Sequence, residues 1–261
     1  MIENKAVIFD MDGVLVDSEP LFMDKVERFY QSHGKNVSLN EIHKLVGSSY
    51  SLQKKLMTEW YQENLSEDAF MDFYHETSEK LIFNYNDLIN TYIKYILPKL
   101  KQDNIKTAIA SSSPKEDIEK FLKDCNLESY FDCIVSGRDF KESKSNPEIY
   151  LYTVNKLNVK KENCIVLEDS TYGIQAAKNA GIFVMAHIDH RYGFDQSLAD
   201  DTFYDFLEAY NKIKAYIKKF LFLIFIVFFE IIRFRYLKRN VYSNTLVIWK
   251  SYHTYDLYTI N

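Results

Sequence analysis

The feature that most constrains the fold is a series of short, unbroken apolar runs separated by segments of helical periodicity. Strands that are buried on both faces show such continuous runs, as in parallel sheets covered by helices. Strand and helix patterns that alternate along the chain are typical of a doubly wound, Rossmann-like α/β fold with a parallel sheet. The predicted strands are residues 6–9, 106–110, 164–167 and 182–186, with a weaker fifth at 133–135.

A different pattern fills the interval from residue 19 to about residue 86. Apolar residues recur there at helical spacing, and no strand pattern occurs. Gly34 fits the end of a helix, while Ser38 and Glu41 fit a capping box at the start of the next one. We therefore expect an all-helical cap domain over residues 19–86, inserted into an α/β core that consists of residues 1–18 and 87–215.

The composition is that of a globular protein and excludes some classes of partner. Of 261 residues, 47% are hydrophobic, and the formal net charge is −5, so the chain can bury a large core. No basic stripe precedes the far C-terminus, so nucleic acid is not expected as a partner. The three cysteines have no metal-binding spacing, and a strand pattern follows the first residues directly, which predicts a cytoplasmic protein without a signal peptide.

Two pairs of acidic residues directly follow predicted strands. Asp10 and Asp12 follow the first strand, and Glu168 and Asp169 follow the strand at 164–167. The step from Asp12 to Gly13 would by itself also fit a hairpin turn. Ligands of open α/β sheets bind beyond the carboxyl ends of the strands, so we expect both pairs at one edge. Two like charges about 4 Å apart repel by roughly 4 kcal/mol at an effective dielectric constant of 20. An all-oxygen cluster of this kind predicts bound Mg²⁺.

Two further segments fit the binding of a phosphate group. Ser111 ends the second predicted strand, where its hydroxyl would meet a phosphate oxygen near the N–H groups of the next helix. Ser113, with Pro114 next and Glu116 three residues on, has the pattern of a helix N-cap. The serines of this segment would also fit purely structural turn and capping roles. Lys144 lies in a loop, where lysines are usually solvated, but a bound dianion would require its charge.

These residues resemble the motifs of the haloacid dehalogenase (HAD) superfamily, in the subfamily of β-phosphoglucomutase and the sugar-phosphate phosphatases with helical caps. The stretch Asp-Met-Asp-Gly-Val-Leu-Val-Asp-Ser at residues 10–18 is similar to the first motif of that family. The second, third and fourth motifs are matched by Ser111, by Lys144 and by the pair Glu168 and Asp169. The resemblance covers about residues 1–215.

The resemblance implies a Mg²⁺-dependent phosphatase, which is a phosphoric monoester hydrolase. It makes Asp10 the nucleophile that becomes an aspartyl-phosphate and Asp12 the general acid and base. It implies that Mg²⁺ contacts the Asp10 carboxylate, the Asp12 carbonyl and Asp169, with Glu168 orienting the metal's ligands. The presence of Asp12 and Asp169 favours phosphorus chemistry over dehalogenation. The phosphate oxygens would be bound by Ser111 and Lys144.

The same family contains hydrolases and mutases. A β-phosphoglucomutase has a cap-loop arginine for its second phosphate and a histidine shortly after its first motif. The matching loop here, residues 46–52, has no arginine, and Phe22 stands at the histidine position. We therefore expect hydrolysis of a small phosphorylated metabolite, first of all a sugar phosphate, with cap contacts from Gly47, Ser48 and Ser49. A phosphosugar mutase and a non-catalytic, membrane-tethered relative are the alternatives.

Residues 216–261 form an atypical hydrophobic and aromatic C-terminal extension. Phe, Ile, Tyr, Asn, Lys and Leu dominate it, and Glu230 interrupts its apolar run. A membrane-spanning helix needs about 20 apolar residues. Membrane contact is therefore conceivable only through residues 220–237 and is not expected. A marginal anchor, an interfacial helix and a packed helix all stay open. Because A/T-rich codons encode most of these residues, a frameshifted or read-through extension is a further hypothesis.

Overall fold

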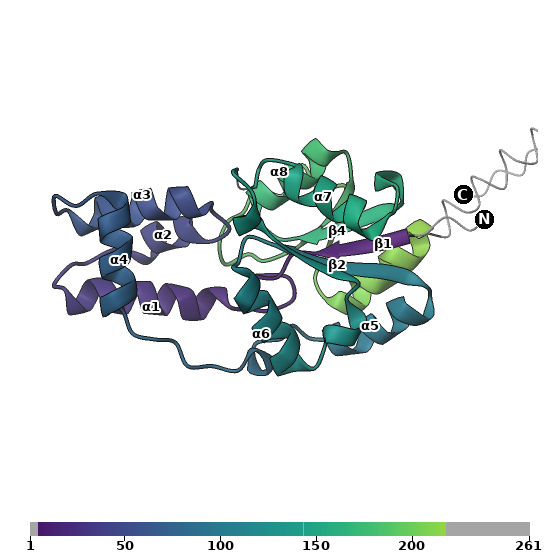
Figure 1. Ribbon diagram of the computed structural model, residues 1–261, viewed down its shortest axis with the longest axis horizontal. Coiled ribbons are helices and arrows are strands. Elements are labelled where there is room, and N and C mark those ends of the chain that lie inside the picture. Colours follow the sequence, from purple (N-terminus) through teal and green to yellow (C-terminus); the bar gives the residue numbers. More distant parts are fainter. Residues whose placement is uncertain (1–4, 143, 218–261) are drawn as a thin grey trace, which may run out of the picture. The chain divides into compact units, whose positions relative to one another are not determined.

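The computed structural model describes residues 5–142 and 144–217, and a six-stranded parallel sheet forms its centre (Figure 1). The strands are β1 (Lys5–Phe9), β2 (Ile105–Ser111), β3 (Cys133–Ser136), β4 (Cys164–Glu168), β5 (Phe183–His187) and β6 (Asp201–Phe203). Their order is β3-β2-β1-β4-β5-β6, and all neighbouring strands are parallel. The predicted doubly wound fold is thus confirmed, and the five predicted strands agree with the observed ones to within one residue.

Helices cover both faces of this sheet. In Figure 1, α5 (Ile93–Gln102) and α6 (Lys115–Cys125) lie on one face, and α7 (Glu148–Leu157) and α8 (Thr171–Ala180) lie on the other. A continuous apolar cluster joins one face of the strands to α7 and α8. The 3₁₀ turns η3 (Glu128–Tyr130), η4 (Gly137–Asp139) and η5 (Lys161–Asn163) lie in the connections, and residues 206–217 are also helical.

The interval between β1 and β2 contains a group of helices with a hydrophobic core of its own. These elements are α1 (Glu19–Ser32), α2 (Leu39–Ile42), η1 (His43–Leu45), α3 (Tyr50–Tyr61) and α4 (Glu67–Thr77). Eleven buried side chains from this interval, aromatic ones prominent among them, pack into one cluster. The capping box of Ser38 and Glu41 is present, as predicted. The domain boundaries at residues 18, 86 and 215 stay a prediction.

Part of the predicted helical interval has no helix. Residues 78–84 form an irregular connection between α4 and η2 (Tyr85–Asp87), so the expectation of helix throughout residues 19–86 is wrong there. Leu81 and Phe83, two residues apart, both line the cavity described below. A spacing of two places side chains on one side of an extended chain, which explains why helical periodicity is lost in this segment.

The backbone contacts divide the chain into two units, Met1–Asn211 and Lys212–Asn261. The predicted C-terminal extension lies almost wholly outside the described residues, and so does the candidate membrane segment 220–237. Within residues 5–142 and 144–217, no helix has both the length and the apolar character that a bilayer crossing requires.

Candidate active site

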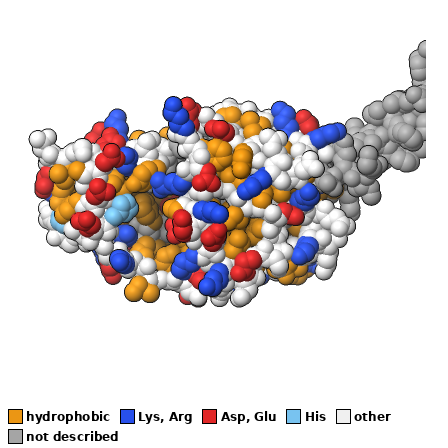
Figure 2. Space-filling model, viewed as in Figure 1, with side chains coloured by type: hydrophobic (Ala, Val, Ile, Leu, Met, Phe, Trp, Pro, Cys, Tyr) orange, Lys and Arg blue, Asp and Glu red, His pale blue; other side chains and the backbone are white. Residues whose placement is uncertain are grey.

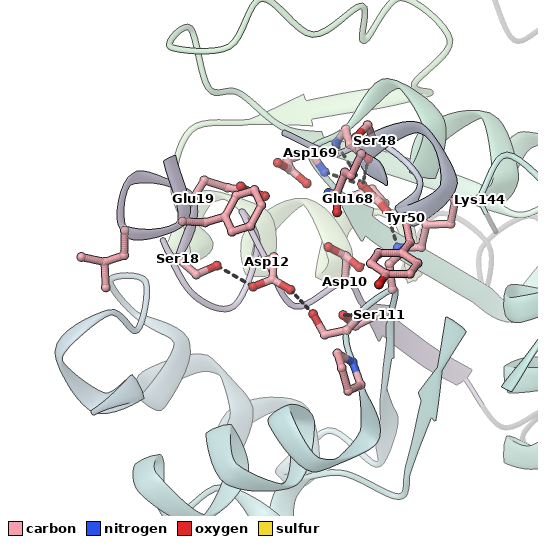
Figure 3. Close-up of a pocket in the computed structure, with 18 of the residues that line it drawn as sticks. Asp10, Asp12, Ser18, Glu19, Ser48, Tyr50, Ser111, Lys144, Glu168 and Asp169 are labelled. Atoms are coloured by element: carbon pink, nitrogen blue, oxygen red, sulfur yellow. Dashed lines mark hydrogen bonds and ion pairs between the residues drawn. The ribbon is translucent and has the colours of Figure 1, made fainter. Parts of the chain in front are cut away.

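The carboxyl ends of the central strands and the helical segment together line one cavity of about 260 Å³ (Figure 3). The predicted core residues that line it are Asp10, Asp12, Ser111, Lys144, Glu168 and Asp169. Of the three predicted cap residues, Gly47 and Ser48 line the cavity, whereas Ser49 does not. The Ser49 hydroxyl instead accepts a hydrogen bond from the N–H of Leu52 and thereby caps α3.

The turn after β1 fixes the position of Asp10. The backbone N–H of Asp10 donates to the carbonyl of Leu167 at 2.9 Å, which continues the pairing of β1 with β4 by one residue. Gly13 has a φ of +77°, and a Cβ at this position would collide with the Asp169 carboxylate. His187 donates from Nδ1 to the Gly13 carbonyl at 2.8 Å. The turn therefore needs glycine both for its backbone conformation and for the close approach of Asp169.

The two predicted acidic pairs meet in one cluster around a buried lysine. One carboxylate oxygen from each of Asp10, Glu168 and Asp169 lies within 4.8 Å of the other two. The Lys144 Nζ lies 2.5 Å from Asp10 Oδ1 and 2.6 Å from Glu168 Oε1. Because the Lys144 side chain is only 7% exposed, its charge acts inside the cluster rather than in solvent. The sequence pattern alone left this lysine as a possible solvated loop residue.

Glu168 is held by more hydrogen bonds than the other carboxylates of the cluster. Its Oε1 accepts from Lys144 and, at 3.0 Å, from the Tyr150 hydroxyl. Its Oε2 accepts from the N–H of Asp169 at 2.9 Å and from both the N–H and the hydroxyl of Ser170 at 3.0 Å. A Cβ on Gly173 would collide with this carboxylate. Glu168 therefore orients both Lys144 and the start of α8.

The protonation equilibria of the cluster show that it has too little positive charge. Burial raises the pKa of Asp10 to about 8, and Glu168 and Asp12 add to this rise although Lys144 opposes it. Burial, with Glu168 and Asp10, also raises the pKa of Asp169 well above its ordinary value. Burial disfavours ionised Glu168 too, but Lys144 and the hydrogen bonds outweigh it and lower the pKa of Glu168. Lys144 and Glu168 thus form an ion pair, while Asp10 and Asp169 need further positive charge to ionise fully.

Asp12 lies beside this cluster and is held by two hydroxyl groups. Ser18 donates to Asp12 Oδ1 at 2.5 Å, and Ser113 donates to Asp12 Oδ2 at 2.6 Å. The predicted N-cap role of Ser113 is therefore wrong, because α6 begins after Pro114 without a side-chain cap. The contact with Asp12 is charge-assisted and therefore stronger than a hydrogen bond between neutral groups. The Ser113 N–H donates to the buried Ser111 hydroxyl at 3.0 Å.

The cavity contains functional candidates that the sequence pattern did not identify. Glu19 begins α1 and lines the cavity, and burial together with Asp12 and Asp10 raises its pKa to about 8. Tyr50 at the start of α3 and Arg138 in η4 line it as well. Glu19 directly follows the first acidic motif, which could have identified it as a site residue. Its position at the start of a helical pattern instead made it look like an ordinary residue of the helix. Arg138 follows the end of β3, where the general rule for open α/β sheets also applies.

An acidic cluster at the carboxyl edge of a doubly wound sheet, with helices inserted after its first strand, defines an α/β protein whose site could hold a cation. The model of the haloacid dehalogenase-like hydrolase family matches residues 7–187 of this chain. The chain belongs to that family, and it is a phosphatase of the phosphoric monoester hydrolase class. The resemblance expected from the sequence motifs is thereby confirmed.

Three known proteins illustrate the similarity. A "phosphorylated carbohydrates phosphatase" of Thermotoga maritima is 35% identical over 198 residues, which are 75% of this chain and 88% of that protein. "Hexitol phosphatase B" of Escherichia coli is 32% identical over 184 residues, which are 67% of this chain and 79% of that protein. The β-phosphoglucomutase structure from Clostridium difficile, at 24% identity, aligns with a TM-score of 0.65 over 81% of this chain and 99% of its own, which shows a shared fold.

Proposed function

We propose that this protein hydrolyses the phosphomonoester of a small phosphorylated carbohydrate, with Mg²⁺ as cofactor and an aspartyl-phosphate on Asp10 as intermediate. The observation that carries this proposal is the convergence of Asp10, Glu168 and Asp169 around Lys144 in one cavity. The substrates named for the similar proteins of T. maritima and E. coli support a carbohydrate.

The donor set of the cluster fits a hard divalent cation. Asp10, Glu168 and Asp169 offer only carboxylate oxygens, which Mg²⁺ prefers. The raised pKa values of Asp10 and Asp169 mean that a dication would bind by favouring the ionised forms of these carboxylates. We assign the binding of Mg²⁺ to Asp10 and Asp169, with the Asp12 carbonyl as a further ligand and Glu168 positioning the group. Bound there, Mg²⁺ would neutralise charge on the phosphoryl oxygens.

The residues of the site divide the reaction into two steps. In the first step an Asp10 carboxylate oxygen forms a bond to phosphorus, the bond from phosphorus to the ester oxygen breaks, and Asp12 gives that oxygen a proton. In the second step Asp12 takes a proton from water, and the resulting oxygen nucleophile displaces the Asp10 carboxylate and releases phosphate. Ser18 and Ser113 would hold the Asp12 carboxylate in place for both proton transfers.

The phosphate group would be bound between β2 and the Lys144 loop. Ser111 offers its hydroxyl at the end of β2, and the first N–H groups of α6 have no acceptor within their own helix. Lys144 would share its ammonium between Asp10 and the phosphoryl oxygens. Fixed donors of this kind stabilise the charge that spreads over the equatorial oxygens in the transition state.

The remainder of the cavity fits a sugar-sized leaving group. Glu19 and Ser48 provide polar atoms, and Leu21, Phe22 and Leu81 provide apolar surface. The volume of about 260 Å³ is near the lower end of small-molecule sites. The helical segment, which the structure describes in full, contributes Phe22 but no arginine to this lining, and the arginine there, Arg138, belongs to the core. The lack of a cap arginine in the lining favours water over a second sugar hydroxyl as the phosphoryl acceptor. Figure 2 shows acidic and basic side chains intermixed on the face it draws, in agreement with a small-molecule partner.

The proposal is tested by phosphate release from a panel of sugar and hexitol phosphates, with Mg²⁺ and with a chelator. We expect release that depends on Mg²⁺ and that disappears in Asp10→Asn. The matched control is Asp24→Asn, which alters an exposed carboxylate on α1 and should retain the wild-type rate to within about twofold. Phosphate release that persists in Asp10→Asn would refute the assignment of Asp10 as the nucleophile. Isomerisation of a sugar phosphate without phosphate release would show that the protein is a mutase.

A further inference from the structure

We propose that Arg138 is a specificity-determining residue that binds a second anionic group of the substrate, a carboxylate or a second phosphate. This inference rests on the proposed function, because it concerns the part of the substrate that does not react. The preferred substrates would then be phosphorylated carbohydrates that carry a second negatively charged group besides the reacting phosphate. Three observations carry it: the anchoring of Arg138, the charges of the cavity, and the stacking of its guanidinium.

The backbone of Arg138 is anchored to the segment that holds the reacting phosphate. The Ser136 hydroxyl donates to the Ser113 carbonyl at 2.7 Å and accepts from the Arg138 N–H at 3.2 Å. A Cβ on Gly137 would lie 3.2 Å from the Cα of Ser112, so η4 packs tightly against the end of β2. Arg138 therefore projects from a rigid turn and not from a free loop.

The charges that line the cavity leave one cation available. Among the described residues, five acidic and two basic ones line it, the basic ones being Lys144 and Arg138. Lys144 is engaged with Asp10 and Glu168. Arg138 forms no ion pair with any residue that the structure describes. Its charge acts electrostatically on the carboxylate of Asp117 on α6. Burial raises the pKa of Asp117, and Arg138 only partly opposes that rise. A second anion in the cavity would therefore be attracted to Arg138.

Stacking on Tyr50 orients the guanidinium for this role. The Arg138 Cζ lies 3.9 Å from the centre of the Tyr50 ring, and both residues line the cavity. A stacked guanidinium uses its face, so its N–H groups stay free in the plane for a two-pronged contact with a carboxylate or phosphate. Figure 3 shows Tyr50 among the residues that line the cavity. Arg138 is exposed, so the stack is what holds its guanidinium at the wall of the cavity with its N–H groups available.

The alternative is that the contact between Arg138 and Tyr50 has only a structural role, which is to attach α3 to the core. The two possibilities differ in which substrates a change of Arg138 affects. A fastening contact would change the kinetics of every substrate alike, whereas an anion contact would affect only substrates that carry the second charge. It would also act on KM rather than on kcat, because the contact is made equally in the ground state and the transition state.

The experiment compares three probes with the full chain: a hexitol 6-phosphate, the 6-phosphate of the corresponding aldonic acid, and a hexose 1,6-bisphosphate. We expect wild type to have a lower KM for at least one of the two doubly charged probes. Arg138→Met should raise that KM about tenfold, with kcat and the hexitol phosphate KM changed less than about twofold. Arg138→Lys should restore part of the loss. The control Lys123→Met, which removes an exposed charge in the last turn of α6, should have no effect.

An equal rise of KM for all three probes would overturn the inference and show that the stack only attaches α3 to the core. A wild-type KM that is lowest for the hexitol phosphate would overturn the inference as well. The carboxylate and bisphosphate arms show which anion is bound. Calorimetric binding of the probes to Asp10→Asn, with and without Arg138→Met, separates this inference from the proposed function. Binding that depends on Arg138 in a protein whose wild type releases no phosphate would refute only the hydrolysis. Binding that ignores Arg138 would refute only the inference.

Discussion

Replacing Lys144 by Met tests the electrostatic account of the site most directly. The substitution keeps most of the apolar stem but removes an ammonium that is 2.5 Å from Asp10 and 2.6 Å from Glu168. The lysine side chain is 7% exposed and the Glu168 side chain 0%, so water cannot replace the lost charge without opening the structure. The variant therefore leaves a buried carboxylate without its cation.

The expected loss follows from the burial of this ion pair. Removing one partner of a buried pair costs about 3–5 kcal/mol. In a domain of roughly 200 residues, each 1 kcal/mol lowers Tm by about 2–4 °C, so a fall of about 10 °C is expected. Because folded domains have about 5–15 kcal/mol of stability, the variant should still fold. Saturating Mg²⁺ at about 100 times its Kd should return about 2.7 kcal/mol.

The assay is urea unfolding followed by circular dichroism at pH 8, in chelator and in Mg²⁺. Lys178→Met is the matched control, because Lys178 lies 2.5 Å from Asp200 but both side chains are about a third exposed. Exposed pairs contribute about 0–1 kcal/mol, so this variant should lose no more than that. If Lys144→Met and Lys178→Met lost the same free energy of unfolding, Lys144 would not neutralise the cluster as described.

Three more predictions follow from the same geometry. Gly13→Ala should abolish turnover and lower stability by about 2 kcal/mol or more, because it combines a positive φ with a collision against Asp169; urea unfolding and phosphate release test this. Ser113→Ala removes a hydroxyl from the Asp12 carboxylate and should lower kcat about tenfold with little change in KM, whereas equal kcat values would remove Ser113 from the positioning of Asp12. Without Mg²⁺ the protein should become less stable between pH 6 and pH 8. Burial raises the pKa of both Asp10 and Glu19 to about 8 from about 4, so the folded state binds more protons than the unfolded state and stability falls as pH rises. Urea midpoints that rise over this range would contradict the sign, and added Mg²⁺ should reduce the dependence.

The sheet was predictable because its strands have one environment along their whole length. The strands β1, β2 and β4 are buried on both faces, so their sequences are continuous apolar runs. The strand β6 was missed because it is only three residues long and carries Asp201 and Thr202, a pattern that also fits a loop. The strand β6 lies at the edge of the sheet, where polar residues such as these can be accommodated. Its edge position is a property of the assembled sheet and cannot be read from the local sequence.

The site was predictable where residues directly follow strands. The positions of Asp10, Ser111 and Glu168 follow from the rule that places ligands at the carboxyl edge of a sheet. The contacts of Arg138 and of Ser113 were not predictable in this way. The guanidinium of Arg138 stacks on Tyr50, which comes from another part of the chain. The Ser113 hydroxyl donates to Asp12, which is 101 residues away in the sequence.

The position of β1 inside the sheet has a consequence for the order in which the molecule can form. Ala6 pairs with Lys106 on one side and with Cys164 on the other, so this strand is synthesised early but finds its neighbours late. The helices α1 to α4 build their cluster from residues close together in sequence, and such local contacts form fast. The strand β1 can pair with β2 first, but its other edge stays open until β4 leaves the ribosome. Only then do Asp10 and Asp169 approach each other, so a divalent cation that binds both carboxylates would stabilise the completed sheet but not the earlier, partly paired one.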